Sequence, residues 1–339
     1  MPGQPSPEVT PDRVMQFAFG YAPTLILEAA IRTGVFDTLD ESPKTVAEVS
    51  QATGASERGL KAIMNALVGL DFLSRDDAGR YSNAPDVSVF LVTTKPTFFG
   101  GILRHTSEQL LPKWLAINEI VRTGRPPVHI NKESDGASFF VELVQDIFPM
   151  SYKAAQTLGQ TLGVASTQTA LKVLDIAAGS GVWGIALAQQ SPSVTVSAVD
   201  WPEVLGVTRM YAERFGLSDR FSFISGDILE ADFGGGYNVA TLGHILHSEG
   251  ADRSKVLLNK VYASLAPGGT IAIAEMVPNE DRRGPVFPLI FAVNMLVNTD
   301  HGDTFTFDEM AAWLKDAGFV DVRFVEAPSP SPLILATKP

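Results

Sequence analysis

The sequence contains no cysteine, and this absence excludes several kinds of chemistry. A chain without thiols forms no disulfide bond, carries no thiolate nucleophile and binds no metal through sulfur. Long apolar runs are also missing, because the stretches at 24–31 and 287–297 are short and are interrupted by Glu28 and Asn294. A helix that spans a bilayer needs about 20 apolar residues. We therefore expect no membrane partner.

Basic residues are outnumbered, since 26 Lys and Arg stand against 38 Asp and Glu and the formal net charge is -12. The phosphate backbone of a nucleic acid favours clustered Lys and Arg, and the sequence has no such cluster. We therefore expect no nucleic-acid partner. The first ten residues lack the basic start and apolar core of a secretory signal, so the expected location is cytoplasmic.

The composition is that of a globular protein able to bury a sizeable core. Hydrophobic residues make up 45% of the 339 residues and charged residues 19%. This length exceeds what one ordinary domain needs, so we expect one large and one small domain.

The first part of the chain has a helical pattern. Apolar residues at helical spacing predict one helix from Thr10 to Gly34. A second helix is predicted from Thr45 to Gly54, and a third begins at Ser56. The segment 72–82 follows as a small hairpin around a turn at 76–79. Two helices joined by a tight turn and followed by a hairpin are typical of a winged helix, which we assign to residues 1–98.

Two further helical stretches, at 100–124 and 139–162, flank a polar loop at 125–136. We interpret residues 99–168 as a helical connector that contributes to an acceptor pocket.

After residue 168 the pattern changes to short apolar strands that alternate with amphipathic helices. This alternation predicts an α/β domain over 169–339, with a Rossmann-like parallel sheet and helices on both faces. The seven predicted strands cover residues 172–176, 195–199, 221–225, 237–242, 270–274, 320–324 and 333–337.

The most informative run is residues 173–184, VLDIAAGSGVWG, where a strand ends in a glycine loop and leads into a helix. Gly179, Gly181 and Gly184 match the spacing of a dinucleotide-binding fingerprint, and Asp200 lies at the distance expected of a ribose-binding carboxylate. This pattern alone is weak. Asp175, just before the loop, favours a different cofactor, as the resemblance below implies.

Two more motifs complete the pattern: Gly226-Asp227 directly after a predicted strand, and the turn LAPGG at 265–269 before the next. With these motifs, residues 170–339 resemble the class I S-adenosylmethionine-dependent methyltransferase fold. The whole chain resembles O-methyltransferases of the caffeic-acid and acetylserotonin type, whose winged-helix domain serves dimerisation.

The resemblance implies S-adenosylmethionine as the cofactor and a homodimer as the assembly. One departure is that Ala177 and Ala178 stand where many family members have glycine. The residues that the resemblance places at the cofactor are Asp175, Gly179, Gly181, Asp200, Trp201, Gly226, Asp227 and Ile228.

The candidate catalytic residues are His247, in the run LGHILHSE after the fourth strand, and Glu275, at the end of the fifth. Ligands gather at the carboxyl ends of parallel strands, and a neutral imidazole suits proton abstraction near neutral pH. The resemblance implies that His247 takes the proton of the acceptor hydroxyl and that Glu275 orients it. Ser248 replaces the usual Asp after the histidine, and a second family acid is replaced near Thr304, where Asp303 is a possible substitute.

His244 lies three residues before His247. We interpret it as a hydrogen-bonded structural histidine, with a second polar group of the active site as the alternative. No histidine and carboxylate spacing indicates a metal site, so none is expected. Residues that either line the acceptor pocket or pack in the core are Phe148, Phe291, Asn294 and Met295.

The sequence therefore predicts an enzyme that transfers a methyl group from S-adenosylmethionine to a hydroxyl of a small aromatic acceptor. One alternative is a relative that uses the cofactor for hydroxylation or pericyclic chemistry. Another is a DNA-binding regulator that senses a small molecule, although the segment 56–70 offers only Arg58, Lys61 and Asn65 for a recognition helix.

Overall fold

The computed structural model describes residues 9–126, 130, 133–328 and 331–339. The chain forms two compact units, Met1–Leu110 and Leu111–Pro339. The predicted three-part division at 98/99 and 168/169 stays a prediction.

The first unit begins with helices α1 (Asp12–Ala18) and α2 (Ala22–Arg32). One continuous helix was expected here, and this expectation is wrong. The helix breaks at Gly20 and restarts just before Pro23, whose ring has no N–H to continue the hydrogen-bond ladder. The predicted end is correct, because Gly34 follows with a left-handed φ of 77°.

A short helix α3 (Val35–Asp40), which was not predicted, precedes the predicted elements. The first of these is α4 (Val46–Thr53), which is held by a capping box between Thr45 and Glu48. The hydroxyl of Ser56 accepts from the N–H of Gly59 and caps α5 (Glu57–Gly69). The hairpin strands β1 (Leu73–Arg75) and β2 (Tyr81–Asn83) then pair antiparallel. The winged-helix assignment itself stays a prediction.

The first unit closes with α6 (Pro85–Phe90), α7 (Gly101–His105) and a π-helical turn (Thr106–Leu110). Its buried core lies among α2, α3, α5 and the hairpin, and includes Leu27, Phe36, Leu60, Met64 and Tyr81.

The start of this unit carries an exposed apolar surface. Phe17 is 75% exposed and Val14 is 70% exposed. The segment Asp12–Arg32 has the length and the mean hydropathy, 1.4, of a helix that could cross a membrane, and only 11% of its most apolar part is buried. Length and composition alone are weak evidence for a membrane span. An apolar surface that a protein partner covers has the same composition.

The second unit begins with helices α8 (Leu111–Trp114), α9 (Ile117–Thr123), α10 (Glu133–Asp146) and α11 (Phe148–Thr161), followed by a 3-10 turn (Val164–Ser166). The predicted stretch 139–162 is thus two helices, because Pro149 stands in the first turn of α11 and starts a new helix there.

The predicted sheet is confirmed. Its seven strands lie in the order β5-β4-β3-β6-β7-β9-β8, and only β9 runs antiparallel to its neighbours. The chain leaves β3 in one direction toward β4 and β5 and later returns on the other side to β6 and β7. In open α/β sheets, ligands bind at the carboxyl ends of the strands where such a change of direction occurs, which here is between β3 and β6. The strands are β3 (Leu171–Ile176), β4 (Val194–Asp200), β5 (Phe221–Ser225), β6 (Tyr237–Gly243), β7 (Leu265–Ala274), β8 (Val320–Val325) and β9 (Leu333–Thr337).

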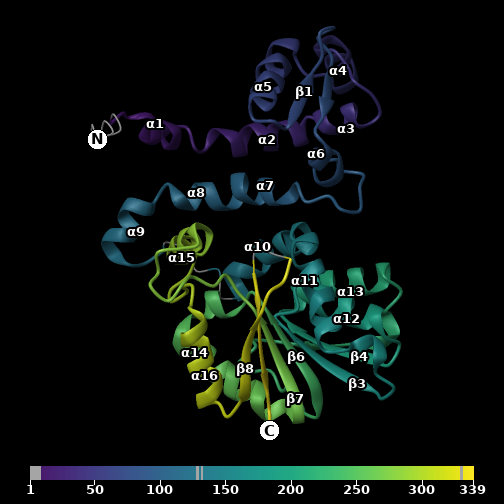
Figure 1. Ribbon diagram of the computed structural model, residues 1–339, viewed down its shortest axis with the longest axis vertical. Coiled ribbons are helices and arrows are strands. Elements are labelled where there is room, and N and C mark those ends of the chain that lie inside the picture. The colour runs from purple at the N-terminus through teal and green to yellow at the C-terminus, as the bar shows by residue number, and fades with distance from the viewer. Residues whose placement is uncertain (1–8, 127–129, 131–132, 329–330) are drawn as a thin grey trace, which may run out of the picture. The chain divides into compact units, whose positions relative to one another are not determined.

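Helices cover both faces of this sheet (Figure 1). Successive residues of β3 point to opposite sides, so Val173 packs with α11, α12 (Val182–Gln190) and α13 (Pro202–Arg214). Leu174 packs on the other face with α14 (Leu246–Ser264) and α16 (Phe307–Asp316). Helix α15 (Val286–Asn298) precedes α16. Burial on both faces explains why the middle of β3, Val173 and Leu174, is apolar.

Candidate active site

The glycine loop joins β3 to α12 through a series of left-handed residues. Ala177, Gly179 and Gly181 have φ of 51°, 57° and 74°. A Cβ at Gly181 would lie 2.8 Å from Cγ2 of Thr208, and one at Gly184 would lie 2.6 Å from Cγ1 of Val196. These glycines therefore allow the loop and the start of α12 to pack closely against their neighbours.

Asp175 is fully buried at the end of β3. Its Oδ2 accepts from the N–H of Gly184 at 3.0 Å, and its Oδ1 accepts from Oγ1 of Thr241 at 2.7 Å. Burial raises its pKa to about 7, although both hydrogen bonds act in the opposite direction. Asp175 thus ties α12 and β6 to β3, and its predicted role toward the cofactor stays a prediction.

Asp200, at the end of β4, faces the glycine loop. Its Oδ2 accepts from the N–H of Gly179 at 2.9 Å and its Oδ1 from the N–H of Trp201 at 2.8 Å. Burial raises the pKa of Asp200 to about 6. Each carboxylate oxygen has a second lone pair, which suits a pair of ribose hydroxyls. The ring of Trp201 packs edge-on against Phe140, with centroids 5.9 Å apart.

Gly226, Asp227 and Ile228 follow β5. The N–H of Gly226 donates to the carbonyl of Asp200, which brings this turn beside the end of β4. Asp227 accepts from the N–H of Leu229 at 2.8 Å and lies 3.4 Å from a guanidinium nitrogen of Arg253. Arg253 was not predicted from the sequence, because only the fold brings α14 to this turn.

These residues fit S-adenosylmethionine. Two carboxylates, Asp200 and Asp227, lie at the ends of the adjacent strands β4 and β5, and Gly179 in the loop beside Asp200 has a left-handed backbone and carries no side chain of its own. The cofactor offers ribose hydroxyls and an adenine amine, which are donors for such carboxylates.

The second half of the site lies after β6 and β7. Nδ1 of His247 is 2.8 Å from Oε2 of Glu275, and the main-chain N–H of His247 donates to Oε1 at 3.2 Å. The pKa of Glu275 lies below its ordinary value. Burial acts to raise this pKa, but the attraction and the hydrogen bonds between Glu275 and His247 lower it by more. An ionised Glu275 makes Nδ1 the donor and leaves the lone pair of His247 on Nε2.

The backbone around His247 is held by a loop after α15. The N–H of Asp303 donates to the carbonyl of His247 at 2.9 Å, and a Cβ at Gly302 would lie 2.5 Å from the same oxygen. The carboxylate of Asp303 accepts from the N–H of Thr304. Asp303 thus binds His247 through its backbone, and replacement of the missing acid by its carboxylate stays a prediction.

His244 differs from the hydrogen-bonded structural histidine that was expected. Both of its ring nitrogens are buried and have no hydrogen-bond partner within the part of the chain that the structure describes. Its φ is 64°, and its N–H donates to the carbonyl of Ala274 at 2.9 Å. The sequence does not distinguish a hydrogen-bonded histidine from one whose ring nitrogens have no partner, because the difference depends on tertiary packing.

The four candidate acceptor residues lie in different surroundings. Phe291 packs edge-on against His247, with centroids 5.0 Å apart at 90°. Phe148 stacks on Tyr211 at 4.6 Å within the core. Asn294 accepts from the indole N–H of Trp114 at 3.0 Å, and Met295 is buried. Phe291 is thus the candidate whose ring packs against His247.

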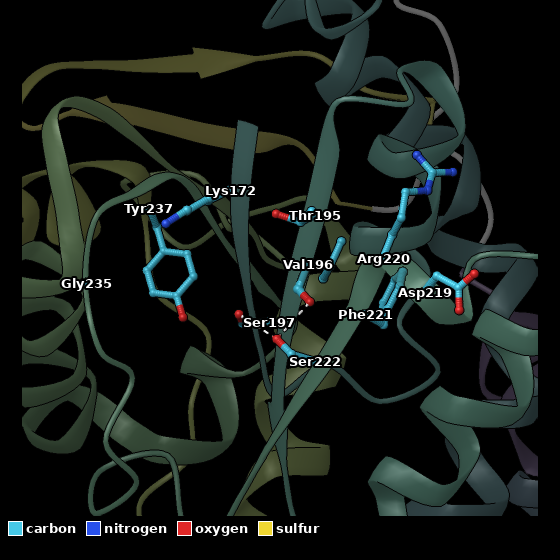
Figure 2. A pocket seen from close by; sticks show the side chains of 10 residues that line it. All are labelled: Lys172, Thr195, Val196, Ser197, Asp219, Arg220, Phe221, Ser222, Gly235 and Tyr237. Atoms are coloured by element: carbon cyan, nitrogen blue, oxygen red, sulfur yellow. Dashed lines mark hydrogen bonds between the residues drawn. The ribbon is translucent and has the colours of Figure 1, made fainter. Parts of the chain in front are cut away.

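A separate hollow of about 310 Å³ lies at the amino-terminal ends of the parallel strands (Figure 2). Lys172, Thr195, Phe221 and Tyr237 stand at or near the beginnings of four strands that line it. This hollow therefore lies at the opposite ends of the strands from His247 and Glu275.

The fold and the glycine loop define a class I methyltransferase domain, and comparisons with known proteins identify the family. The family model of the O-methyltransferase domain matches residues 114–320, and that of the O-methyltransferase dimerisation domain matches residues 15–93. The chain belongs to the S-adenosylmethionine-dependent O-methyltransferase family.

Individual relatives match over almost the whole chain. The 3-hydroxy-5-methyl-1-naphthoate 3-O-methyltransferase of Streptomyces sahachiroi is 30% identical over 335 residues, covering 97% of this chain and 95% of the relative. The tetracenomycin polyketide synthesis 8-O-methyl transferase of Streptomyces glaucescens is 26% identical, covering 97% of each. The crystal structure of human N-acetylserotonin methyltransferase with S-adenosylmethionine has a TM-score of 0.86 at 25% identity, covering 99% of both chains.

Proposed function

We propose that this enzyme methylates a hydroxyl of a small aromatic acceptor, with His247 as the general base and Glu275 as the residue that orients it. The observation that carries this proposal is the contact between Nδ1 of His247 and Oε2 of Glu275 at the carboxyl edge of the sheet. The same edge carries the glycine loop and Asp200.

The two halves of the site divide the work. When bound, S-adenosylmethionine supplies a methyl group that its sulfonium already activates for displacement. Gly179, Asp200 and Asp227 hold this cofactor in the proposal, and much of the acceleration comes from alignment of the acceptor oxygen with the methyl carbon.

His247 supplies the proton acceptor. A phenol becomes a far better nucleophile as it loses its proton, and a positioned base contributes about 10²–10⁴-fold to such a step. Glu275 holds Nδ1 of the imidazole, so Nε2 is the atom that takes the proton. The positive charge that then develops on the ring is stabilised by the buried carboxylate.

An aromatic acceptor is supported by two observations. The relatives named above act on a naphthoate and on a tetracenomycin polyketide, according to their names. In this chain, Phe291 places an aromatic ring beside the proposed base. Ring-to-ring packing with such a side chain suits a flat aromatic ligand.

We also propose a homodimer. The dimerisation-domain match begins at residue 15, within the exposed apolar segment of α1 and α2. A second copy of this chain would remove Phe17 and its neighbours from water. The cytoplasmic location stays a prediction.

The test begins with calorimetric titration of S-adenosylmethionine and of its demethylated product into wild type, Asp200→Ala and the control Asp219→Ala. We expect binding to wild type and the control, and its loss in Asp200→Ala. Incubation with a panel of naphthols then follows, with mass spectrometry of the products. A gain of one CH₂ unit supports the proposal, whereas a product that has gained oxygen or has only rearranged would favour the alternative non-methylating chemistry.

A further inference from the structure

His244 is a partly buried histidine of the proposed site whose two ring nitrogens lack a hydrogen-bond partner among the described residues. Its Nδ1 and Nε2 are both buried and unpaired within residues 9–126, 130, 133–328 and 331–339. A buried donor or acceptor that makes no hydrogen bond destabilises the fold, and native structures contain few such groups. A ligand that pairs with these nitrogens would account for a histidine at this position.

The backbone of His244 is held in an uncommon conformation. Its φ of 64° is left-handed, and the N–H bond to the carbonyl of Ala274 fixes it at the end of β6. Non-glycine residues in this region cluster at functional sites, where the surrounding structure maintains them. The preceding Gly243 has no side chain, and a Cβ there would lie 1.9 Å from Nε1 of Trp183.

The imidazole lies beside the proposed base. The ring centroids of His244 and His247 are 6.4 Å apart, and the ring of Trp183 is 6.5 Å from His244 on the glycine-loop side. A ring nitrogen of His244, a ring nitrogen of His247 and a carboxylate oxygen of Glu275 lie within 4.8 Å of one another. A group bound to His244 is therefore close to the oxygen from which His247 takes a proton.

We propose that His244 is a specificity-determining residue that hydrogen-bonds a second oxygen of the acceptor, adjacent to the hydroxyl that is methylated. This inference rests on the proposed function. The acceptor class that it defines is an aromatic ring with two neighbouring oxygens, either two hydroxyls or a hydroxyl and a carbonyl. A neutral imidazole serves both, because one ring nitrogen donates and the other accepts.

The electrostatic environment agrees with a neutral ring. Burial lowers the pKa of His244 to about 4, and the nearby His247 acts in the same direction while Glu275 opposes it.

A divalent cation is the competing ligand, since two histidines and a carboxylate form a familiar zinc-binding set. The hydrogen bond between His247 and Glu275 occupies two of these three groups, which favours an organic ligand. All assays therefore include a second series with EDTA.

The test compares two probes of the same ring system, naphthalene-2,3-diol and 2-naphthol. Wild type, His244→Phe and His244→Asn are assayed for kcat/KM with each probe and for binding of each probe to the complex with S-adenosylhomocysteine. Phe keeps a ring without nitrogens, whereas Asn keeps hydrogen-bonding atoms and tolerates a left-handed φ. Calorimetry with S-adenosylhomocysteine and a melting curve establish that each variant is folded.

We expect wild type to favour the diol by about tenfold, since a site that pairs with a substrate hydroxyl discriminates against its absence. In His244→Phe the preference should fall to about twofold, the statistical value for two equivalent hydroxyls, and His244→Asn should regain part of it. A preference unchanged in His244→Phe, equal use of both probes by wild type, or binding of neither probe would overturn the inference. So would loss of the preference with EDTA. Methylation of both probes without discrimination would leave the proposed function intact.

Discussion

Nδ1 of His247 lies 2.8 Å from Oε2 of Glu275, and the main-chain N–H of the same histidine donates to Oε1. The carboxylate thus fixes both the ring and the backbone of the residue that it orients. The position of the imidazole therefore depends on Glu275 as well as on Asp303, whose N–H donates to the carbonyl of His247.

Replacement of His247 by Ala should lower kcat/KM for a phenolic probe by about 10²–10⁴-fold, because it removes the proposed proton acceptor. Binding of S-adenosylmethionine should be unchanged, and the residual rate should rise with pH as the phenol ionises in solution. His301→Ala, at an exposed histidine, is the control. Steady-state kinetics across pH, with calorimetry of the cofactor, measure both effects. A variant with the wild-type rate would exclude His247 as the base.

Asp175 should make stability depend on pH. Its pKa is raised from 3.8 to about 7, so the folded state holds a proton that the unfolded chain has released. The bound proton of Asp175 contributes fully to the free energy of unfolding below pH 4. This contribution is lost as the pH rises toward about 7, at up to about 1.4 kcal/mol per pH unit. Urea unfolding of wild type and Asp175→Asn between these values isolates the effect. Parallel pH curves for the two proteins would contradict it.

Ala177→Gly should stabilise the protein by about 0.5–1 kcal/mol, because Ala177 has a left-handed φ of 51° that costs an alanine more than a glycine. The neighbouring Ala178 is buried and does not have a left-handed φ. Ala178→Gly is therefore the matched control and should destabilise by about 0.5–1 kcal/mol. Equilibrium unfolding measures both changes, and equal signs would disprove the strain argument.

Phe17→Asp should shift the protein from dimer to monomer, since it places a charge on a 75% exposed apolar position within the dimerisation-domain match. Val256→Asp changes a 56% exposed residue of α14 and should leave the assembly unchanged. Light scattering after size-exclusion chromatography gives the mass of each. A Phe17→Asp protein that remains dimeric would place the interface elsewhere.

Much of the sheet could be predicted because each strand combines an apolar run with a turn signal. Six predicted strands agree with the structure to within about one or two residues at each end. β7 begins at Leu265, five residues before the predicted strand, because Leu265 already pairs with Tyr237. The register then shifts, and the next pair is Thr270 with Val239. The residues between Leu265 and Thr270 bulge out of the pairing, and the hydrophobic pattern of the sequence does not reveal such an irregularity.

The site was predictable where a residue's neighbours in sequence define its place. Asp200 and Glu275 end strands, and His247 follows one, so the parallel topology gathers them at one edge. The missing partners of His244 could not be predicted, because they depend on packing against Trp183 and His247. The surroundings of Phe148 were equally inaccessible, since helical spacing is the same in a core and in a pocket.

The change of chain direction between β3 and β6 has an evolutionary consequence. Gly179, Asp200 and Asp227 come from the β3, β4 and β5 side, whereas His247, Glu275 and Phe291 come from β6, β7 and the segment after them. Selection for a new acceptor can therefore alter Phe291 and the segment around it, while the first group and the pair of His247 and Glu275 are preserved. A lineage built on this sheet can diversify its products and retain one methyl donor.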